Sequence, residues 1–132
     1  MHTDRSPARL AVAALAGLAA MAGGCSWSTG ASPVDAPRAR QALAVALDGW
    51  KKGDPPSAFK DALPAMTVQD LDWIGGARLL DYRIEGDGKE AGANLHIPAS
   101  LTLRTPQGQE VRKKVSYVVG TSPILTVFRD FR

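Results

Sequence analysis

Residues 94–104 alternate between apolar side chains and a second set that is polar except for Pro98. A period of two places one set of side chains on each face of a β-strand, so this stretch predicts a strand with one buried and one solvated face. Another part of the chain must cover the buried face. The apolar set is Leu95, Ile97, Ala99, Leu101 and Leu103.

The residues before this strand have the pattern of an amphipathic helix, which would cover its buried face. Asp35 is a favourable N-cap residue, Pro37 is tolerated in a first helical turn, and Gly53 suits the position after a helix C-terminus. The residues between them predict an amphipathic helix over 36–52. Its apolar residues recur at helical spacing, at Leu43, Ala46, Leu47 and Trp50.

A short second helix is expected from Ser57 to Leu63, with Phe59 and Leu63 on one side and Pro64 as the stop. Further alternation over 80–85, 111–119 and 124–131 predicts more strands, joined by Gly-containing turns at 87–88 and 105–108. The fold class is therefore α+β, with an N-terminal helix and a short second helix packed on a curved antiparallel sheet of four to five strands.

Two positions in the strands carry further expectations. Pro98 cannot donate a backbone hydrogen bond, which predicts an edge or a bulge there. Arg129 and Asp130 occupy opposite faces of the last strand, so one of them points towards the helix. An inward Arg129 needs a carboxylate partner, for which Asp48 or Asp81 would serve.

The beginning of the chain has the pattern of an export signal. Arg5 and Arg9 precede an uncharged run from Leu10 to Gly24, which is typical of a secretory signal peptide over 1–24. This run is shorter than a membrane-spanning helix requires. The small residues Ala20 and Ala22 fit ordinary signal peptidase, with a soluble periplasmic product that starts at Gly23.

The second interpretation centres on Cys25, the single cysteine of the chain. Residues 22–25 resemble a bacterial lipobox, which implies lipidation of the Cys25 sulfur, palmitate included, and cleavage just before it. A lone cysteine in an exported protein has no disulfide partner within the chain, and lipidation gives it a role. We expect a lipidated Cys25 with a flexible tether over 25–37, and a single α+β domain over 38–132.

Charge and composition exclude several classes of function. Without residues 1–24 the chain keeps 14 Lys and Arg and 12 Asp and Glu, a net charge of +2 that gives no reason to expect nucleic acid binding. His96 would be the only remaining histidine, so no multi-histidine metal site is expected. Nucleotide-binding loops and a nucleophile elbow are absent from the sequence, and we expect no cofactor.

The order of helix and strands resembles the cystatin-like and nuclear-transport-factor-two-like group of folds. The likeness lies in residues 40–50 with Gly53, and in the strand segments 81–82, 101–103, 117–119 and 125–127. Small uncharacterised exported bacterial proteins are similar over 39–131, including the pairs 69–70 and 72–73. This resemblance implies a curved sheet that wraps a long N-terminal helix.

The resemblance to isomerases of that group implies an alternative in which the chain is an enzyme. In such isomerases a desolvated carboxylate abstracts a proton, and a Tyr lies beside it. Asp72, with Tyr82 or Tyr117, would be the corresponding set here. The residues themselves favour another interpretation, in which Asp70 and Asp72 cap a turn before Gly75 and Trp73 closes the core.

Two hypotheses of function follow. The first is a lipid-anchored, non-enzymatic domain in the cell envelope, at the outer membrane on the periplasmic side or the surface, which binds an unknown protein or small molecule. Candidate ligand-pocket residues are Trp50, Phe59, Trp73 and Arg129. The alternative is a small isomerase- or hydrolase-like enzyme that uses Asp72 as its base.

Overall fold

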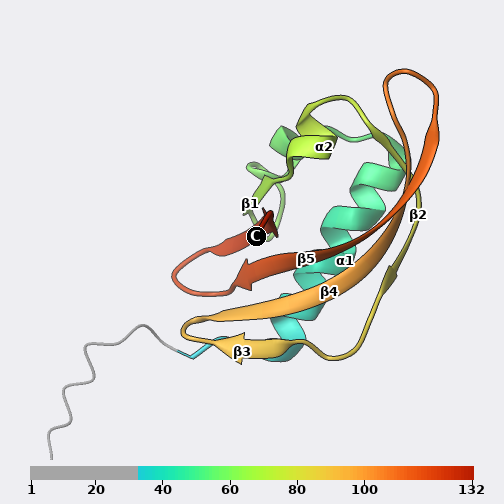
Figure 1. The fold of residues 1–132 in the computed structure, drawn as a ribbon. Helices are drawn as coiled ribbons and strands as arrows, with labels where there is room; N and C mark the ends of the chain where they lie inside the picture. The colour runs from blue at the N-terminus through green and yellow to red at the C-terminus, as the bar shows by residue number, and fades with distance from the viewer. Residues whose placement is uncertain (1–32) are drawn as a thin grey trace, which may run out of the picture.

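The computed structural model describes residues 33–132 and shows an α+β domain. One long helix lies in the concave face of a strongly curved sheet, and two short helical segments pack at one end of it (Figure 1). The elements in chain order are α1 (Ala36–Lys52), η1 (Pro56–Phe59), β1 (Met66–Gln69), α2 (Leu71–Ile74), β2 (Arg78–Ile84), β3 (Lys89–Ala91), β4 (Asn94–Arg104), β5 (Glu110–Gly120) and β6 (Leu125–Asp130).

The predicted bounds and caps of α1 are confirmed. The Asp35 carboxylate accepts a hydrogen bond from the Arg38 N–H, and Gly53 closes the helix in the left-handed conformation, with φ 98°. The face that meets the sheet is made of small and large apolar residues, and Trp50 is 3% exposed. Val34 is also buried, and the Asp35 N–H donates to the Thr121 hydroxyl, so the folded region includes residues just before α1.

The sheet differs from the prediction in strand number and in direction. It has six strands in the order β1-β6-β5-β4-β2, with β3 paired to β4, where four to five antiparallel strands were expected. β1 runs parallel to β6, which makes the sheet mixed. β1 was missed because it has only four residues, too few to show a period, and because the α2 cap follows it directly.

Pro98 lies in an unbroken register between β4 and β5, opposite Ser116, so the predicted bulge at Pro98 is wrong. On the other side of β4, residues 99–104 pair with β2 and residues 94–96 pair with β3. Pro98 lies between these two paired segments. The Pro98 carbonyl accepts a hydrogen bond from the Glu85 N–H at 2.9 Å, and a residue without an N–H is tolerated because no paired strand residue lies opposite it on this side. The register irregularity falls in β2 instead, between Leu79 and Asp81.

The second helix is shorter than predicted. Residues 56–59 form a single 3₁₀ turn, and the segment up to Leu63 is irregular. Phe59 is buried as expected, but Leu63 is 98% exposed, so the two side chains do not share an apolar face. Pro64 restricts the end of this segment, because the residue before a proline is disfavoured from the helical conformation.

Candidate functional site

The turn between β1 and β2 brings two carboxylates to the concave side of the sheet. Asp70 is the N-cap of α2, and its Oδ1 accepts hydrogen bonds from the N–H groups of Asp72 at 2.9 Å and Trp73 at 3.4 Å. Asp70 is 1% exposed. The interpretation of Asp70 as a turn cap, with Trp73 in the core, is therefore confirmed. Asp72, the other predicted cap, instead pairs with Lys113 and Arg129.

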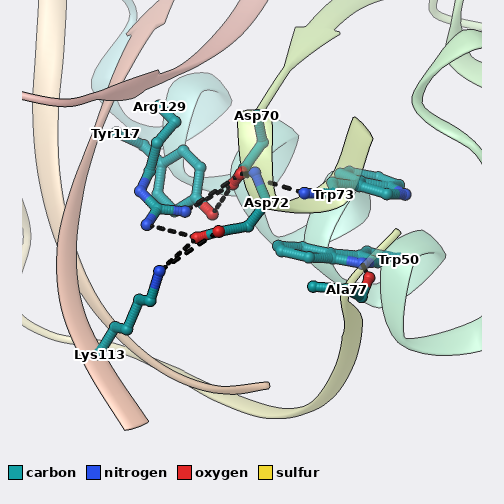
Figure 2. A network of polar contacts seen from close by, with 8 residues as sticks. All are labelled: Trp50, Asp70, Asp72, Trp73, Ala77, Lys113, Tyr117 and Arg129. Atoms are coloured by element: carbon teal, nitrogen blue, oxygen red, sulfur yellow. Dashed lines mark hydrogen bonds and ion pairs between the residues drawn. The ribbon is translucent and has the colours of Figure 1, made fainter. Parts of the chain in front are cut away.

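Arg129 of β6 holds these two carboxylates together (Figure 2). Its Nη1 lies 3.0 Å from Asp70 Oδ2, and its Nη2 lies 2.9 Å from Asp72 Oδ2. The Tyr117 hydroxyl donates to Asp70 Oδ2 at 2.6 Å, and Lys113 Nζ contacts Asp72 Oδ2 at 3.0 Å. We call this set the carboxylate network: Asp70, Asp72, Lys113, Tyr117 and Arg129.

The charges in the carboxylate network balance, with two acids and two bases. Partial burial opposes ionisation of Asp72, but the hydrogen bonds and charges of Lys113 and Arg129 outweigh it and lower the pKa of its carboxyl. Burial, together with the charge and hydrogen bond of Asp70, raises the pKa of Tyr117 far above its usual value. Asp72 is thus held as a carboxylate and Tyr117 as a neutral phenol.

Of the catalytic alternative, Asp72 and Tyr117 share the carboxylate network without a hydrogen bond between them, and Tyr82 is not part of it. Tyr117 donates to Asp70 and not to Asp72, and Tyr82 donates to Asp48 Oδ1 at 2.6 Å. Burial and this hydrogen bond raise the pKa of Tyr82 to about 12. A general base needs a carboxyl pKa raised towards the working pH, whereas the pKa of Asp72 is lowered.

Of Arg129 and Asp130, Arg129 is the residue that points inward, but the partners expected for it are wrong. Asp48 accepts from Tyr82, and Asp81 pairs with Lys51 at 3.6 Å. The actual partners are Asp70, the N-cap of α2, and Asp72 in its first turn, which the parallel pairing of β1 with β6 places beside Arg129. A purely antiparallel topology could not have suggested this proximity.

A cleft lies at the C-terminal end of α1, and two stacked tryptophans are among its lining residues. The rings of Trp50 and Trp73 stack with centroids 5.0 Å apart and an interplanar angle of 4°. Their Nε1 atoms donate to the carbonyl oxygens of Ala77 at 2.9 Å and Asp54 at 2.8 Å. Each ring nitrogen is therefore satisfied within the protein, and the rings are almost completely buried, with Trp50 3% and Trp73 7% exposed.

We call this feature the tryptophan cleft. Its volume is about 800 Å³, and its walls come from the α1–η1 connection, β1, α2 and the start of β2. Its lining residues are Trp50, Gly53, Asp54, Pro55, Pro56, Ser57, Lys60, Thr67, Val68, Gln69, Trp73, Ile74, Gly76, Ala77 and Arg78.

Of the four predicted pocket residues, two line this cleft and two do not. Trp50 and Trp73 line it, whereas Phe59 packs edge-on against Trp73 from behind, with centroids 5.9 Å apart. Arg129 lines a separate hollow with the C-terminal residues. Sequence analysis missed the wall made by β1 and the prolines, although the Pro55-Pro56 pair was a signal of a rigid, donor-free segment.

Within residues 33–132 there is neither a candidate metal site nor a candidate membrane-spanning helix. No group of three His, Cys, Asp or Glu side chains there is arranged to hold a metal ion. None of the helices in this range combines the length and apolarity needed to cross a membrane. Cys25 and the expected signal peptide and tether lie outside the described residues, apart from the tether's last residues, 33–37.

Comparison with known proteins adds no family or neighbour. No protein-family model, curated protein or solved structure matches this chain.

Proposed function

We propose that this protein is a lipid-anchored binding module of the cell envelope, attached through Cys25, and that the tryptophan cleft is its binding site. The observation that carries the proposal is the cleft itself, an open space of about 800 Å³ bordered by the α1–η1 connection, β1, α2 and the start of β2. Concave sites lined by apolar and aromatic surface, with few polar groups, are the usual form of ligand sites.

The position of the cleft supports a tethered module. The described chain enters at the N-terminal end of α1, and the cleft lies at the C-terminal end of the same helix. A 17-residue helix is about 25 Å long, so the cleft is separated from the entry point by that length. A lipid anchor before α1 would leave the cleft facing away from the point of attachment.

The carboxylate network supports binding over catalysis. All of its charged groups have partners of opposite charge within the domain, so it stabilises the turn that forms one wall of the cleft. None of its members lines the tryptophan cleft. The isomerase- or hydrolase-like alternative would require Asp72 to give up two ion pairs before it accepted a proton.

A screen of aromatic fragments tests the binding site. Indole, naphthalene and their carboxylates, added to the ¹⁵N-labelled full-length chain in detergent, should shift the amide resonances of Gly53, Ile74 and Gly76. Thr67→Trp should block the cleft and abolish the shifts, because Thr67 is an exposed wall residue. Lys89→Trp, on the exposed strand β3, is the matched control and should leave them unchanged. Shifts that survive Thr67→Trp would contradict the assignment of this cleft.

A further inference from the structure

β5 is longer than its neighbour β6, and one side of its first half has no strand partner. β4 pairs with one side of β5 over residues 110–120, whereas β6 pairs with the other side only over residues 116–120. Residues 110–115 make no backbone hydrogen bond to the described region beyond the sheet ladder. This segment, which we call the β5 edge, is therefore a free edge of the sheet.

Open space lies beside the β5 edge at the point where β6 ends. A hollow of about 540 Å³ is lined by residues 113–116 of β5 and by residues 129–132 at the end of the chain. Besides its two neighbouring strands, the element that packs closely on β5 is α1, which meets the sheet from its concave face (Figure 1). The hollow thus lies where a further strand would continue the line of β6.

The β5 edge is positively charged. It carries three cations, Arg112, Lys113 and Lys114, against one acid, Glu110. Arg112 and Lys114 point to the convex face, because the residue between them, Lys113, reaches the carboxylate network on the concave side (Figure 2). Both are exposed, and no ion pair joins either of them to another residue of the described region.

The hollow also has an apolar part. Val115 lies on the same face of β5 as the buried Tyr117 and is half-buried. Phe131 is 58% exposed, and its ring centroid lies 4.9 Å from the guanidinium carbon of Arg129. A strand placed along the β5 edge would meet cations on its convex side and apolar surface within the hollow.

Charge determines which strand can pair here. Charged side chains on an edge deter pairing with unsuitable chains. In an antiparallel pair of two copies, Arg112 would lie opposite Lys114 of the second copy, and like charges directly opposite are destabilising. Acidic side chains at the same places would meet both cations favourably. The β5 edge therefore favours an acidic partner over a second copy of the chain.

We propose that the β5 edge binds an extended segment of another protein in which acidic and apolar residues alternate. Backbone hydrogen bonds along β5 hold the segment as an added strand. Its acidic side chains lie beside Arg112 and Lys114, and its apolar side chains enter the hollow beside Val115 and Phe131. This surface is separate from the tryptophan cleft, so the inference goes beyond the proposed function and does not depend on it.

A synthetic peptide provides the test. The probe is an acetylated and amidated hexapeptide in which Glu and Val alternate, added to the ¹⁵N-labelled full-length chain in detergent. Amide hydrogen exchange is followed over residues 110–115. A strand directs its N–H groups alternately to its two sides, so only every second amide faces the free side. We expect exchange of those alternate amides to slow, while the amides bonded to β4 change little.

Three altered peptides separate strand addition from simple attraction between charges. N-methylation of every amide removes the pairing donors. A peptide with the three Glu before the three Val keeps composition and net charge but loses the alternation, and replacement of Glu by Lys reverses the charge. Each change should weaken binding about tenfold or more, since it removes backbone hydrogen bonds or opposite-charge pairs.

Charge reversal of the β5 edge gives a matched pair of variants. Arg112→Glu with Lys114→Glu should exchange the preference, so that the Lys peptide binds better than the Glu peptide. Arg38→Glu with Lys89→Glu makes the same change in net charge at exposed positions outside the hollow, and should keep the original preference.

Three results would overturn the inference. Equal binding of the N-methylated and unmodified peptides would exclude strand addition. Equal binding of the alternating and block peptides would show that net charge alone attracts the ligand. Protection of residues 110–115 that appears with rising protein concentration, without peptide, would show that a second copy of the chain pairs with the β5 edge instead.

Discussion

Arg129 places a positive charge where water is almost excluded, since its side chain is 4% exposed. Burial disfavours this charge, but the negative neighbours Asp70 and Asp72 more than compensate, and the pKa of the guanidinium is raised. Arg suits this position better than Lys, because its planar fork reaches both carboxylates at once. The turn that carries α2 is therefore joined to β6 through one residue.

Removal of this residue should be costly. Arg129→Met keeps much of the side-chain volume but leaves Asp70 buried without its cation, and unfolding free energy should fall by about 3–5 kcal/mol. Urea denaturation followed by circular dichroism measures the change. Arg83→Met, on an exposed site of β2, is the control and should stay within about 0.5 kcal/mol of the original chain. Equal midpoints for the two variants would show that the carboxylate network does not stabilise the domain.

The lowered pKa of Asp72 predicts a dependence on pH. A group with a lower pKa in the folded state stabilises the fold above its unfolded pKa, near 3.8, and this contribution is lost as pH falls further. Asp72→Asn lacks the carboxylate at every pH. The difference in unfolding free energy between the original chain and Asp72→Asn should thus be largest at pH 5–7 and shrink below about pH 4.

Urea midpoints between pH 7 and pH 2.5 would measure that difference. Asp61→Asn changes an exposed carboxylate on the turn after η1 and serves as the control. A difference for Asp72→Asn that grows as the solution becomes more acidic would contradict the ion pairs assigned to Asp72.

At the scale of elements, η1 packs on α1 at a glycine. A Cβ atom on Gly49 would lie 2.4 Å from Cζ of Phe59, closer than real contacts allow. Gly49→Ala gains about 1 kcal/mol of helix propensity but overpacks this contact at a typical cost of about 1–3 kcal/mol. We expect a net loss of stability in thermal or urea unfolding.

The double variant tests the cause. Phe59→Leu removes the ring atom that clashes, so Gly49→Ala should be less harmful in that background than in the original chain. An equal cost in both backgrounds would locate the effect of Gly49→Ala elsewhere in α1.

Elements with a long pattern could be predicted from the sequence, and short ones could not. α1 has 17 residues and β4 has 11, enough for caps and periods to identify both. β1 and η1 have four residues each, and their presence depends on tertiary packing. Trp50 could be predicted as an apolar residue near the end of α1, and Trp73 as a core residue after Asp70 and Asp72. The wall opposite them could not, because it requires the parallel pairing of β1 with β6.

At the scale of the whole molecule, the described domain accounts for residues 33–132, and the proposed anchor lies before it. The chain enters beside the N-terminal end of α1, where Asp35 is bound to Thr121 near the start of β6. The tryptophan cleft is at the other end of the helix. If Cys25 carries lipid, only seven residues separate it from Pro33, so the domain would stay close to the membrane while the cleft remains accessible.

The modification of Cys25 is the prediction that decides this arrangement. A single acyl chain binds a bilayer only marginally, but two or three chains give stable anchoring, at about 0.8 kcal/mol per buried methylene. Cys25→Ser should therefore convert an envelope protein that requires detergent into a soluble one, or leave it uncleaved. Fractionation of bacterial envelopes measures the distribution, and intact-mass analysis measures the modification of the original chain.

Val45→Ser, an exposed position on α1, is the control and should remain in the membrane fraction. An unmodified chain that begins at Gly23 would instead show cleavage after Ala20-Met21-Ala22, and the binding module would then be a soluble protein of the periplasm.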